Sequence, residues 1–202
     1  MRRFRLAFMF AALLTPLILA SPAVAQDQED DIDSGVGIGV LGGLNRTSIR
    51  GDEGSGIETG NGPMVGIWFG GNRNGRVGFM GELSYLERRA TTLGLETKIK
   101  YLEIPAVFRI NVGSRSRDSA SVYGLIGPVF DFKLGESIGG ISTDDNFKGA
   151  DIGILAGVGV EVKRVGFEVR GNWGLKNINQ GDEVITDIKT FSLQILGKLR
   201  FN

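Results

Sequence analysis

Apolar side chains alternate with polar or small ones along most of the chain after residue 34. Within residues 150–163 every second position is apolar: Ile152, Ile154, Ala156, Val158, Val160 and Val162. A period of two predicts β-strands that turn one face toward an apolar environment. No helical period is apparent in this part of the sequence.

The same alternation recurs in eight segments, most of about ten or more residues, separated by turn-forming clusters. We predict strands over residues 35–46, 62–70, 76–88, 98–110, 121–133, 150–163, 165–176 and 188–202. Short connections (71–75, 163–164 and the longer 111–121) alternate with long polar ones (48–61, 89–97, 134–148 and 177–187). In antiparallel strands this places all long loops at one end, as in outer-membrane barrels.

The second face of the last six predicted strands carries charge. Six acids and six bases share it, among many glycines: Glu82, Arg88, Glu103, Arg109, Asp131, Lys133, Asp151, Glu161, Glu168, Arg170, Lys198 and Arg200. An eight-stranded barrel is just wide enough for side chains to fill it, and buried charges must be paired. The equal number of acidic and basic residues on this face therefore favours a polar, ion-paired lumen, with the apolar face of the strands toward lipid. We predict an all-β, eight-stranded antiparallel up-and-down transmembrane barrel.

The N-terminus predicts export. A basic start with Arg2, Arg3 and Arg5 precedes an apolar run over residues 6–20, and Ala23 and Ala25 form an A-x-A cleavage pattern. The run is shorter than the roughly 20 residues of a spanning helix. We therefore divide the chain into a cleaved signal peptide (1–25), an acidic leader (26–34) and a barrel domain (35–202).

Composition narrows the chemistry. Loss of the three signal-peptide arginines changes the formal net charge from 0 to −3, so no basic excess favours nucleic acid. The chain has 32 glycines, no cysteine and no histidine. This excludes thiolate metal sites, Ser-His-Asp and Cys-His catalysis and histidine-ligated metals.

Aromatic residues near the segment ends are expected to form interfacial girdles. They are Trp68, Phe69, Tyr85, Tyr101, Phe132, Trp173 and Phe201. Two prolines, Pro105 and Pro128, fall inside predicted strands, and each should cause a bulge or a missing ladder hydrogen bond.

Three motifs carry a family resemblance: "YLEIPAVFRI" (residues 101–110), "YGLIGPVFDFKL" (123–134) and "DIGILAGVGVEV" (151–162). With these the chain resembles the bacterial outer-membrane β-barrel domain family, also described as porin-family, from about Ser34 to the C-terminus. The closing "FSLQILGKLRF" is similar to the terminal strand that the barrel-assembly machinery recognises, although Asn202 follows the usual terminal aromatic, Phe201. The resemblance implies a location and an architecture, but no pore.

Three other sequence features that could indicate a binding or catalytic site are better interpreted as structural. "GIGVLG" (residues 37–42) matches G-x-G-x-x-G, but no strand precedes it and no helix-forming sequence follows, so we interpret it as a strand with inward glycines. Acid pairs at Asp144–Asp145 and Asp182–Glu183 are interpreted as solvated loop charge. Lumen carboxylates could serve hydrolysis, but the lipid-cleaving and protease enzymes among such barrels rely on histidine.

We therefore expect an integral protein of the bacterial outer membrane that is not an enzyme and holds no cofactor or metal. Its four long external loops would serve envelope or surface interactions. Expected partners are outer-membrane lipid, the barrel-assembly machinery during biogenesis and an unidentified loop ligand, but no nucleic acid. Three alternatives remain open: a small passive porin-like channel, a histidine-independent lipid-acting enzyme and a soluble ligand-binding barrel.

Overall fold

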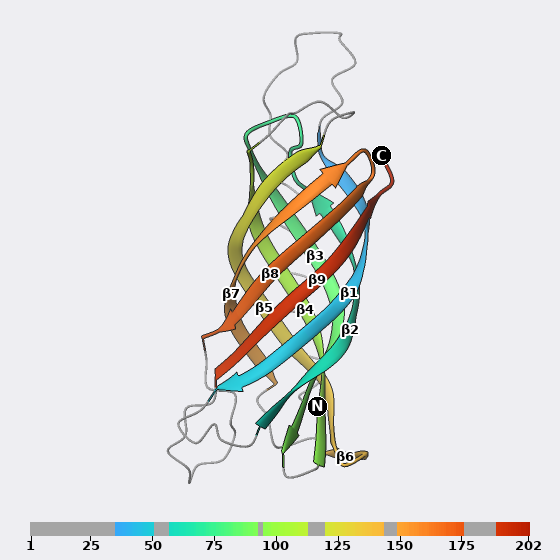
Figure 1. Ribbon diagram of the computed structural model, residues 1–202, viewed down its shortest axis with the longest axis vertical. Coiled ribbons are helices and arrows are strands. Elements are labelled where there is room, and N and C mark those ends of the chain that lie inside the picture. Colours follow the sequence, from blue (N-terminus) through green and yellow to red (C-terminus); the bar gives the residue numbers. More distant parts are fainter. Residues whose placement is uncertain (1–34, 51–56, 93–94, 113–119, 144–148, 176–188) are drawn as a thin grey trace, which may run out of the picture. The chain divides into compact units, whose positions relative to one another are not determined.

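The computed structural model describes residues 35–50, 57–92, 95–112, 120–143, 149–175 and 189–202. They form nine antiparallel strands (Figure 1): β1 (Gly37–Arg50), β2 (Ile57–Gly70), β3 (Val77–Thr92), β4 (Leu95–Asn111), β5 (Ser121–Ile138), β6 (Ile141–Thr143), β7 (Ala150–Val162), β8 (Val165–Gly174) and β9 (Lys189–Arg200). In these ranges no helix is long and apolar enough to cross a membrane.

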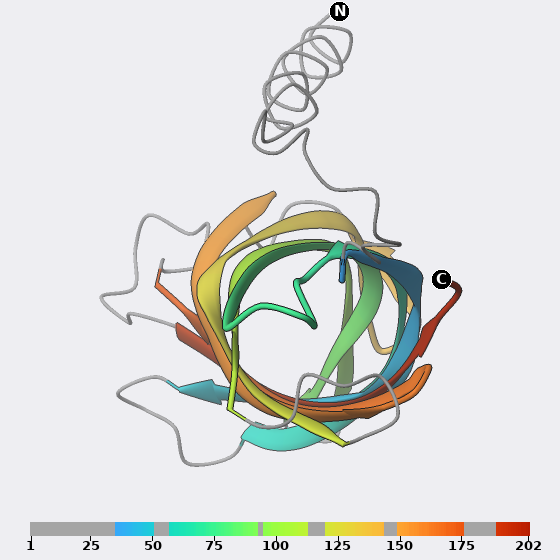
Figure 2. The ribbon, with the colours of Figure 1, turned by 90° about the horizontal axis from the view of Figure 1, so that it is seen from above.

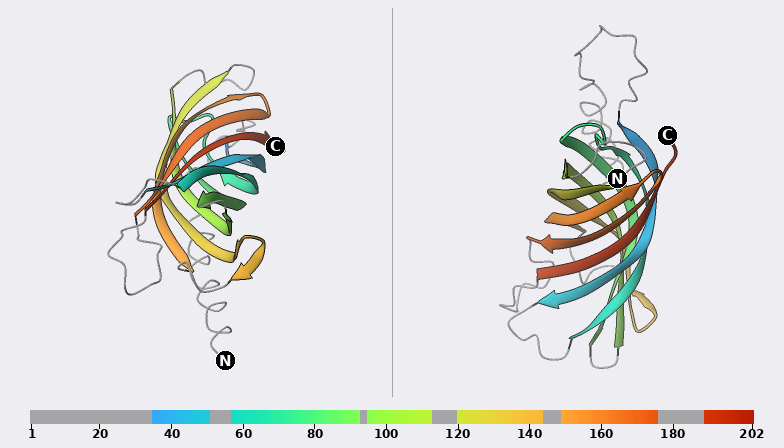
Figure 3. Two further views of the ribbon diagram at one scale, coloured as in Figure 1. Left: turned by 60° about the horizontal axis from the view of Figure 1, so that its bottom comes forward. Right: turned by 45° about the horizontal axis from the view of Figure 1, so that its top comes forward.

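Eight of the strands close into a barrel, and β6 is a short addition to the end of β5. Each barrel strand pairs with its neighbours along the chain, and β1 pairs with β9 to close the sheet. Figure 2 looks into the closed ring, and the two views of Figure 3 show the inclined strands wrapping around one interior. The predicted eight-stranded antiparallel barrel is thereby confirmed.

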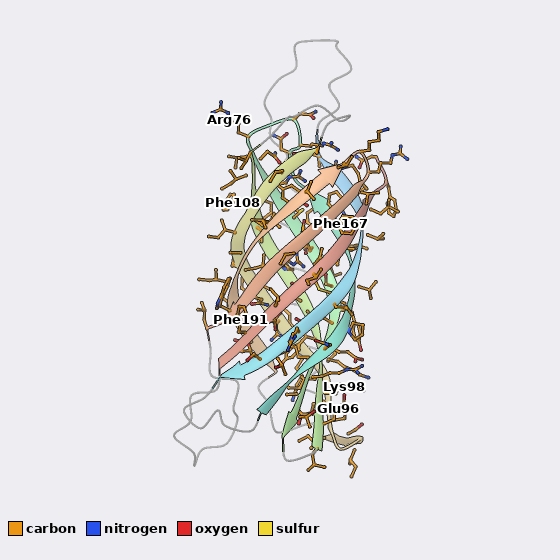
Figure 4. The ribbon with its side chains drawn as sticks, viewed as in Figure 1. Arg76, Glu96, Lys98, Phe108, Phe167 and Phe191 are labelled. Atoms are coloured by element: carbon orange, nitrogen blue, oxygen red, sulfur yellow. The ribbon has the colours of Figure 1, made fainter. Side chains whose placement is uncertain are left out.

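The two faces of the strands are also as predicted. In β7 the side chains of Ile154 and Val158 are 44% and 63% exposed, whereas Leu155 between them is buried. Figure 4 shows outward aromatic rings such as Phe108 and Phe167 along the barrel wall, with Arg76 near one end and Lys98 near the other. The outer wall is thus an apolar band between polar ends, as a lipid-facing barrel requires.

The strands extend further toward the long-loop end than the sequence predicted. The prediction of a long loop over residues 89–97 is wrong, because β3 continues to Thr92 and β4 begins at Leu95. β5 and β6 likewise occupy part of the predicted loop 134–148, and β1 and β2 shorten the loop 48–61. Backbone pairing continues here although the apolar alternation has ended, since polar residues on both faces are compatible with water.

The predicted loop 177–187 lies outside the described residues. The short connections agree with the prediction: β2 ends at Gly70 and β3 begins at Val77, while β7 ends at Val162 and β8 begins at Val165.

Both prolines interrupt the ladder as expected. Pairs between β3 and β4 stop at Gly81–Ala106 and resume at Ser84–Glu103, so Pro105 has no partner on that side. Pairs between β4 and β5 stop at Pro105–Val129 and resume at Phe108–Ile126, which leaves out Pro128. The register is the same on both sides of each gap. Each proline therefore leaves a gap on one side of its strand without shifting the sheet.

The prediction that Trp68 and Tyr101 belong to the interfacial aromatic girdles is wrong. Trp68 and Tyr101 are 3% and 1% exposed and lie inside the barrel. The reason is their position in the alternation: Trp68 stands between the outward residues Ile67 and Phe69. Trp68 is paired with Gly39, where a side chain would collide with the indole ring. An inward glycine thus makes room for a large ring on the neighbouring strand.

Because the outer face contacts lipid, a charged side chain there should lower the free energy of unfolding by an amount that depends on its depth in the membrane. Replacing Ile154 by arginine should lower the free energy of unfolding by about 2–4 kcal/mol, because the midplane of a bilayer does not solvate the charge. The same change at Ile141, in β6 beyond the barrel, is the matched control and should cost little. Denaturant titration of the barrel folded into lipid vesicles measures both. Equal costs at the two sites would show that Ile154 does not face the membrane interior.

Candidate functional site

The candidate site is the lumen, into which alternate residues of every barrel strand project. Of the twelve charged residues predicted there, eleven are at most 7% exposed, and Lys133 is partly exposed. They are brought together in tiers along the barrel rather than in one cleft.

Arg170 of β8 is the centre of the middle tier. Its Nη1 donates to Glu82 Oε2 at 2.7 Å and lies 3.4 Å from Glu168 Oε2. Its Nε donates to Gln194 Oε1 at 2.7 Å. Since β8 and β3 are four strands apart in the ring of eight, the bond to Glu82 spans the lumen.

A second cation completes this tier. Lys198 of β9 donates from Nζ to Glu82 Oε1 and to Glu168 Oε1, each at 2.7 Å. The hydroxyl of Tyr123 also donates to Glu168 Oε1 at 2.7 Å. Two carboxylates are therefore shared between two cations, and the charges of this group balance.

Glu103, the charged residue of the "YLEIP" motif, is completely buried. Its carboxylate accepts hydrogen bonds from Asn172 Nδ2 at 2.9 Å and from Gln194 Nε2 at 3.0 and 3.1 Å. Arg88 Nη2 lies 3.6 Å away and also binds Asp131. Side-chain amides thus share with arginine the task of solvating this carboxylate.

At the end with the short turns, one carboxylate meets three guanidinium groups. Glu161 Oε2 accepts from Arg109 Nη1 at 2.6 Å, and its Oε1 accepts from Arg200 Nε at 3.0 Å and Arg73 Nη1 at 3.3 Å. The Arg109 guanidinium also lies over the ring of Tyr123, 3.8 Å from its centroid. Three guanidinium groups thus share one carboxylate in the part of this tier that the structure describes.

The other end of the lumen is less enclosed. Lys133 Nζ donates to Glu136 Oε2 at 2.8 Å, and Asp151 Oδ1 accepts from the backbone N–H of Ile152 at 2.7 Å. Sequence reasoning missed Glu136 because it assigned that residue to a loop. One extra residue, Leu134, shifts the β4–β5 register here and turns Glu136 inward.

The interior is filled by side chains. Apolar inward residues alternate with the charged tiers and form a buried cluster that includes Val107, Leu155 and Leu196. Two cavities that these side chains line have volumes of only about 10 Å³ each, space for about one water molecule. The connection between β2 and β3 also turns inward across the mouth (Figure 2), and its Arg73 donates to the carbonyl of Lys163 at 2.6 Å.

Several lumen residues were missed by the sequence analysis. Tyr123, Asn172 and Gln194 stand at inward positions of the alternation, so parity alone could have found them. No sequence pattern indicated Arg73, because this residue lies in a turn. Its side chain is nevertheless only 1% exposed.

Ion pairs and hydrogen bonds join the side chains of the lumen. The carboxylates of Glu82, Glu103 and Glu168 are held by cations or amides, and the chain contains no histidine or cysteine to act as base or nucleophile. No group of acidic residues in the described ranges has the arrangement of a metal site. The loop acids Asp144–Asp145 and Asp182–Glu183 lie outside those ranges.

A closed barrel with an apolar outer band and a charged interior defines the class of small outer-membrane barrels. The chain belongs to the outer membrane protein beta-barrel domain family, whose sequence model matches residues 10–201. This membership confirms the predicted resemblance and location in the outer membrane, and it sets aside the soluble ligand-binding barrel.

Solved structures of other small barrels are similar in fold. Neisserial surface protein A (NspA) has a TM-score of 0.52 and 16% identity, over 83% of this chain and 99% of its own. Ail, the attachment invasion locus protein of Yersinia pestis, has a TM-score of 0.48 and 15% identity, over 83% of this chain and 99% of its own. The outer membrane enzyme PagL has a TM-score of 0.47 and 12% identity, over 82% of this chain and 99% of its own. Curated protein sequences include no match to the chain.

The lumen network predicts a large penalty for removing its central cation. Arg170→Met should lower the free energy of unfolding by about 3–5 kcal/mol, because Glu82 and Glu168 would lose a buried partner. The control is Arg89→Met, which removes an arginine whose ion pair with Glu87 is on the outer face and should cost within about 1 kcal/mol. Urea titration in detergent micelles compares the two variants. If they were equally stable, the lumen pairs would not hold the fold.

Proposed function

We propose that this protein is a non-catalytic outer-membrane barrel that contributes to the envelope and to contacts at the cell surface, with a lumen closed by its own side chains. The observation that carries the proposal is the buried ion-pair network that fills the barrel from Glu161 at one end to Asp131 near the other. The protein would thus act through its outer surface and its loop end.

The filled lumen supports a closed barrel over the porin-like channel. The middle tier spans the interior from β3 to β8, and the cavities on either side hold about one water each. An ion crossing the barrel would have to displace Arg170 or Lys198 from two carboxylates. Separating buried pairs of this kind costs several kcal/mol.

The pairing of the carboxylates also supports a non-catalytic role. A general acid or base needs a free position beside a substrate, in a concave pocket. Glu82 and Glu168 each accept bonds from two cations, and the cavities beside them are too small for a sugar or a lipid. A histidine-independent enzyme would thus have no room for substrate in this lumen.

The loop end supports a role in surface contacts. The β3–β4 hairpin and the β5–β6 hairpin continue beyond the apolar band, and their outer face carries Arg89, Glu96 and Lys98 (Figure 4). The tips of the two hairpins are joined by a hydrogen bond from Gly139 N–H to the Glu96 carbonyl at 2.9 Å. In the proposed orientation these paired hairpins stand outside the cell, after a signal peptide over residues 1–25 has been removed.

Planar-bilayer conductance tests the closed lumen. Pure protein inserted into a bilayer should give no steady single-channel steps, because the ion pairs across the lumen leave no continuous path. A general-diffusion porin in the same bilayer serves as the positive control for insertion and detection. Steady steps of uniform size from this protein would favour the passive channel instead.

Epitope tags test the orientation. A tag inserted between Gly139 and Gly140, in the β5–β6 turn, should bind antibody on intact cells, because outer-membrane barrels place their longer connections outside. The matched tag between Lys163 and Arg164, in the β7–β8 turn, should bind only after the cells are opened. The reverse pattern of labelling would mean that the barrel is inserted the other way.

A further inference from the structure

At the turn end of the lumen, cations outnumber carboxylates among the residues that the structure describes. Glu161 is the carboxylate that binds Arg73, Arg109 and Arg200 in this tier. In the neighbouring tier two carboxylates face two cations, so it has no spare negative charge to offer. Buried charge without compensation is costly, and the two guanidinium groups of Arg109 and Arg200 share this one carboxylate, which favours an additional negative partner beside them.

A small cavity adjoins this tier, and its charged lining is almost entirely cationic. Arg109, Arg164, Lys198 and Arg200 line it together with one carboxylate, Glu161. The cavity has a volume of about 10 Å³, comparable to the space that one water molecule occupies.

Two hydrogen-bond donors at this cavity are buried without an acceptor. Nη2 of Arg109 and Nη2 of Arg200 have no partner among the described residues, although the side chains are only 1% and 3% exposed. The remaining nitrogens of these guanidinium groups are used: Arg109 binds Glu161 and Asn111, and Arg200 binds Glu161 and the Gly35 carbonyl. The free atoms are therefore donors only, which suits an anion better than a cation or an acid.

Neighbouring carboxylates cannot satisfy these donors. Glu168 and Glu82 are already held by Arg170 and Lys198 in the middle tier. Glu161 uses both oxygens on the three arginines. The missing acceptor must therefore come from outside this set of side chains.

We propose that this cavity binds one small inorganic anion of the halide class, held between Arg109 and Arg200. The volume has no room for phosphate, sulfate or an organic carboxylate, and chloride is the halide available to a bacterial cell. The exposed guanidinium of Arg164 at the mouth adds positive potential that attracts the anion. The proposal does not depend on the role of the protein at the cell surface.

Diffraction with bromide in place of chloride tests the site directly. Crystals of the folded barrel grown or soaked in potassium bromide should show an anomalous peak in this cavity, next to Arg109 Nη2 and Arg200 Nη2. Density at this position that bromide does not replace would identify a water molecule and overturn the proposal. Bromide peaks confined to the outer surface would overturn it equally.

Stability in two salts provides an independent test. At constant ionic strength, replacing gluconate by chloride should lower the unfolding equilibrium constant roughly tenfold once chloride exceeds its dissociation constant about tenfold. Arg200→Gln should abolish this response. Arg46→Gln, which removes an exposed arginine from the outer face of β1, should leave it intact.

The wild-type protein alone can decide the matter if Arg200→Gln does not fold. An unfolding constant that is the same in chloride and in gluconate overturns the proposal. A chloride response that survives in a folded Arg200→Gln variant also overturns it, because the anion would then bind elsewhere.

Discussion

The pairing of charges inside a narrow barrel is the constraint on which the rest of this structure depends. Lipid outside requires the polar face of every strand to point inward, and eight strands enclose too little space to hydrate it. Each buried ion costs several kcal/mol unless it finds a partner. Glu82 therefore meets Arg170 across the lumen and Lys198 beside it, and strands far apart in the chain become tied to one another.

The outer wall follows from the same constraint. Once the charges are inside, alternate residues such as Ile154 and Val158 must face lipid, and the sheet must close because lipid cannot satisfy an open edge. The wall tolerates Pro105 and Pro128 because each breaks the ladder on one side only. Beyond the apolar band water replaces lipid, the demand for alternation ends, and the hairpins continue with polar residues on both faces.

The amino-acid sequence was sufficient to predict the features that depend on the two-residue hydrophobic period and on the placement of charged residues. Alternation located the eight barrel strands, and the parity of Glu103 and Arg109 within an apolar strand identified the inward face. It could not locate strand ends beyond the membrane, where β3 and β4 pair without any apolar pattern. Nor could it choose partners: that Glu103 is held mainly by Asn172 and Gln194 depends on the stagger between strands. Arg73 reaches the lumen only because a turn folds inward, which no period records.

The closure of the lumen by paired charges can be observed directly. The measurement is an experimental structure of the barrel in a lipid environment, at a resolution that shows ordered water. We expect isolated waters on either side of an unbroken tier formed by Glu82, Glu168, Arg170 and Lys198. A continuous file of water running through that tier from one mouth to the other would contradict it.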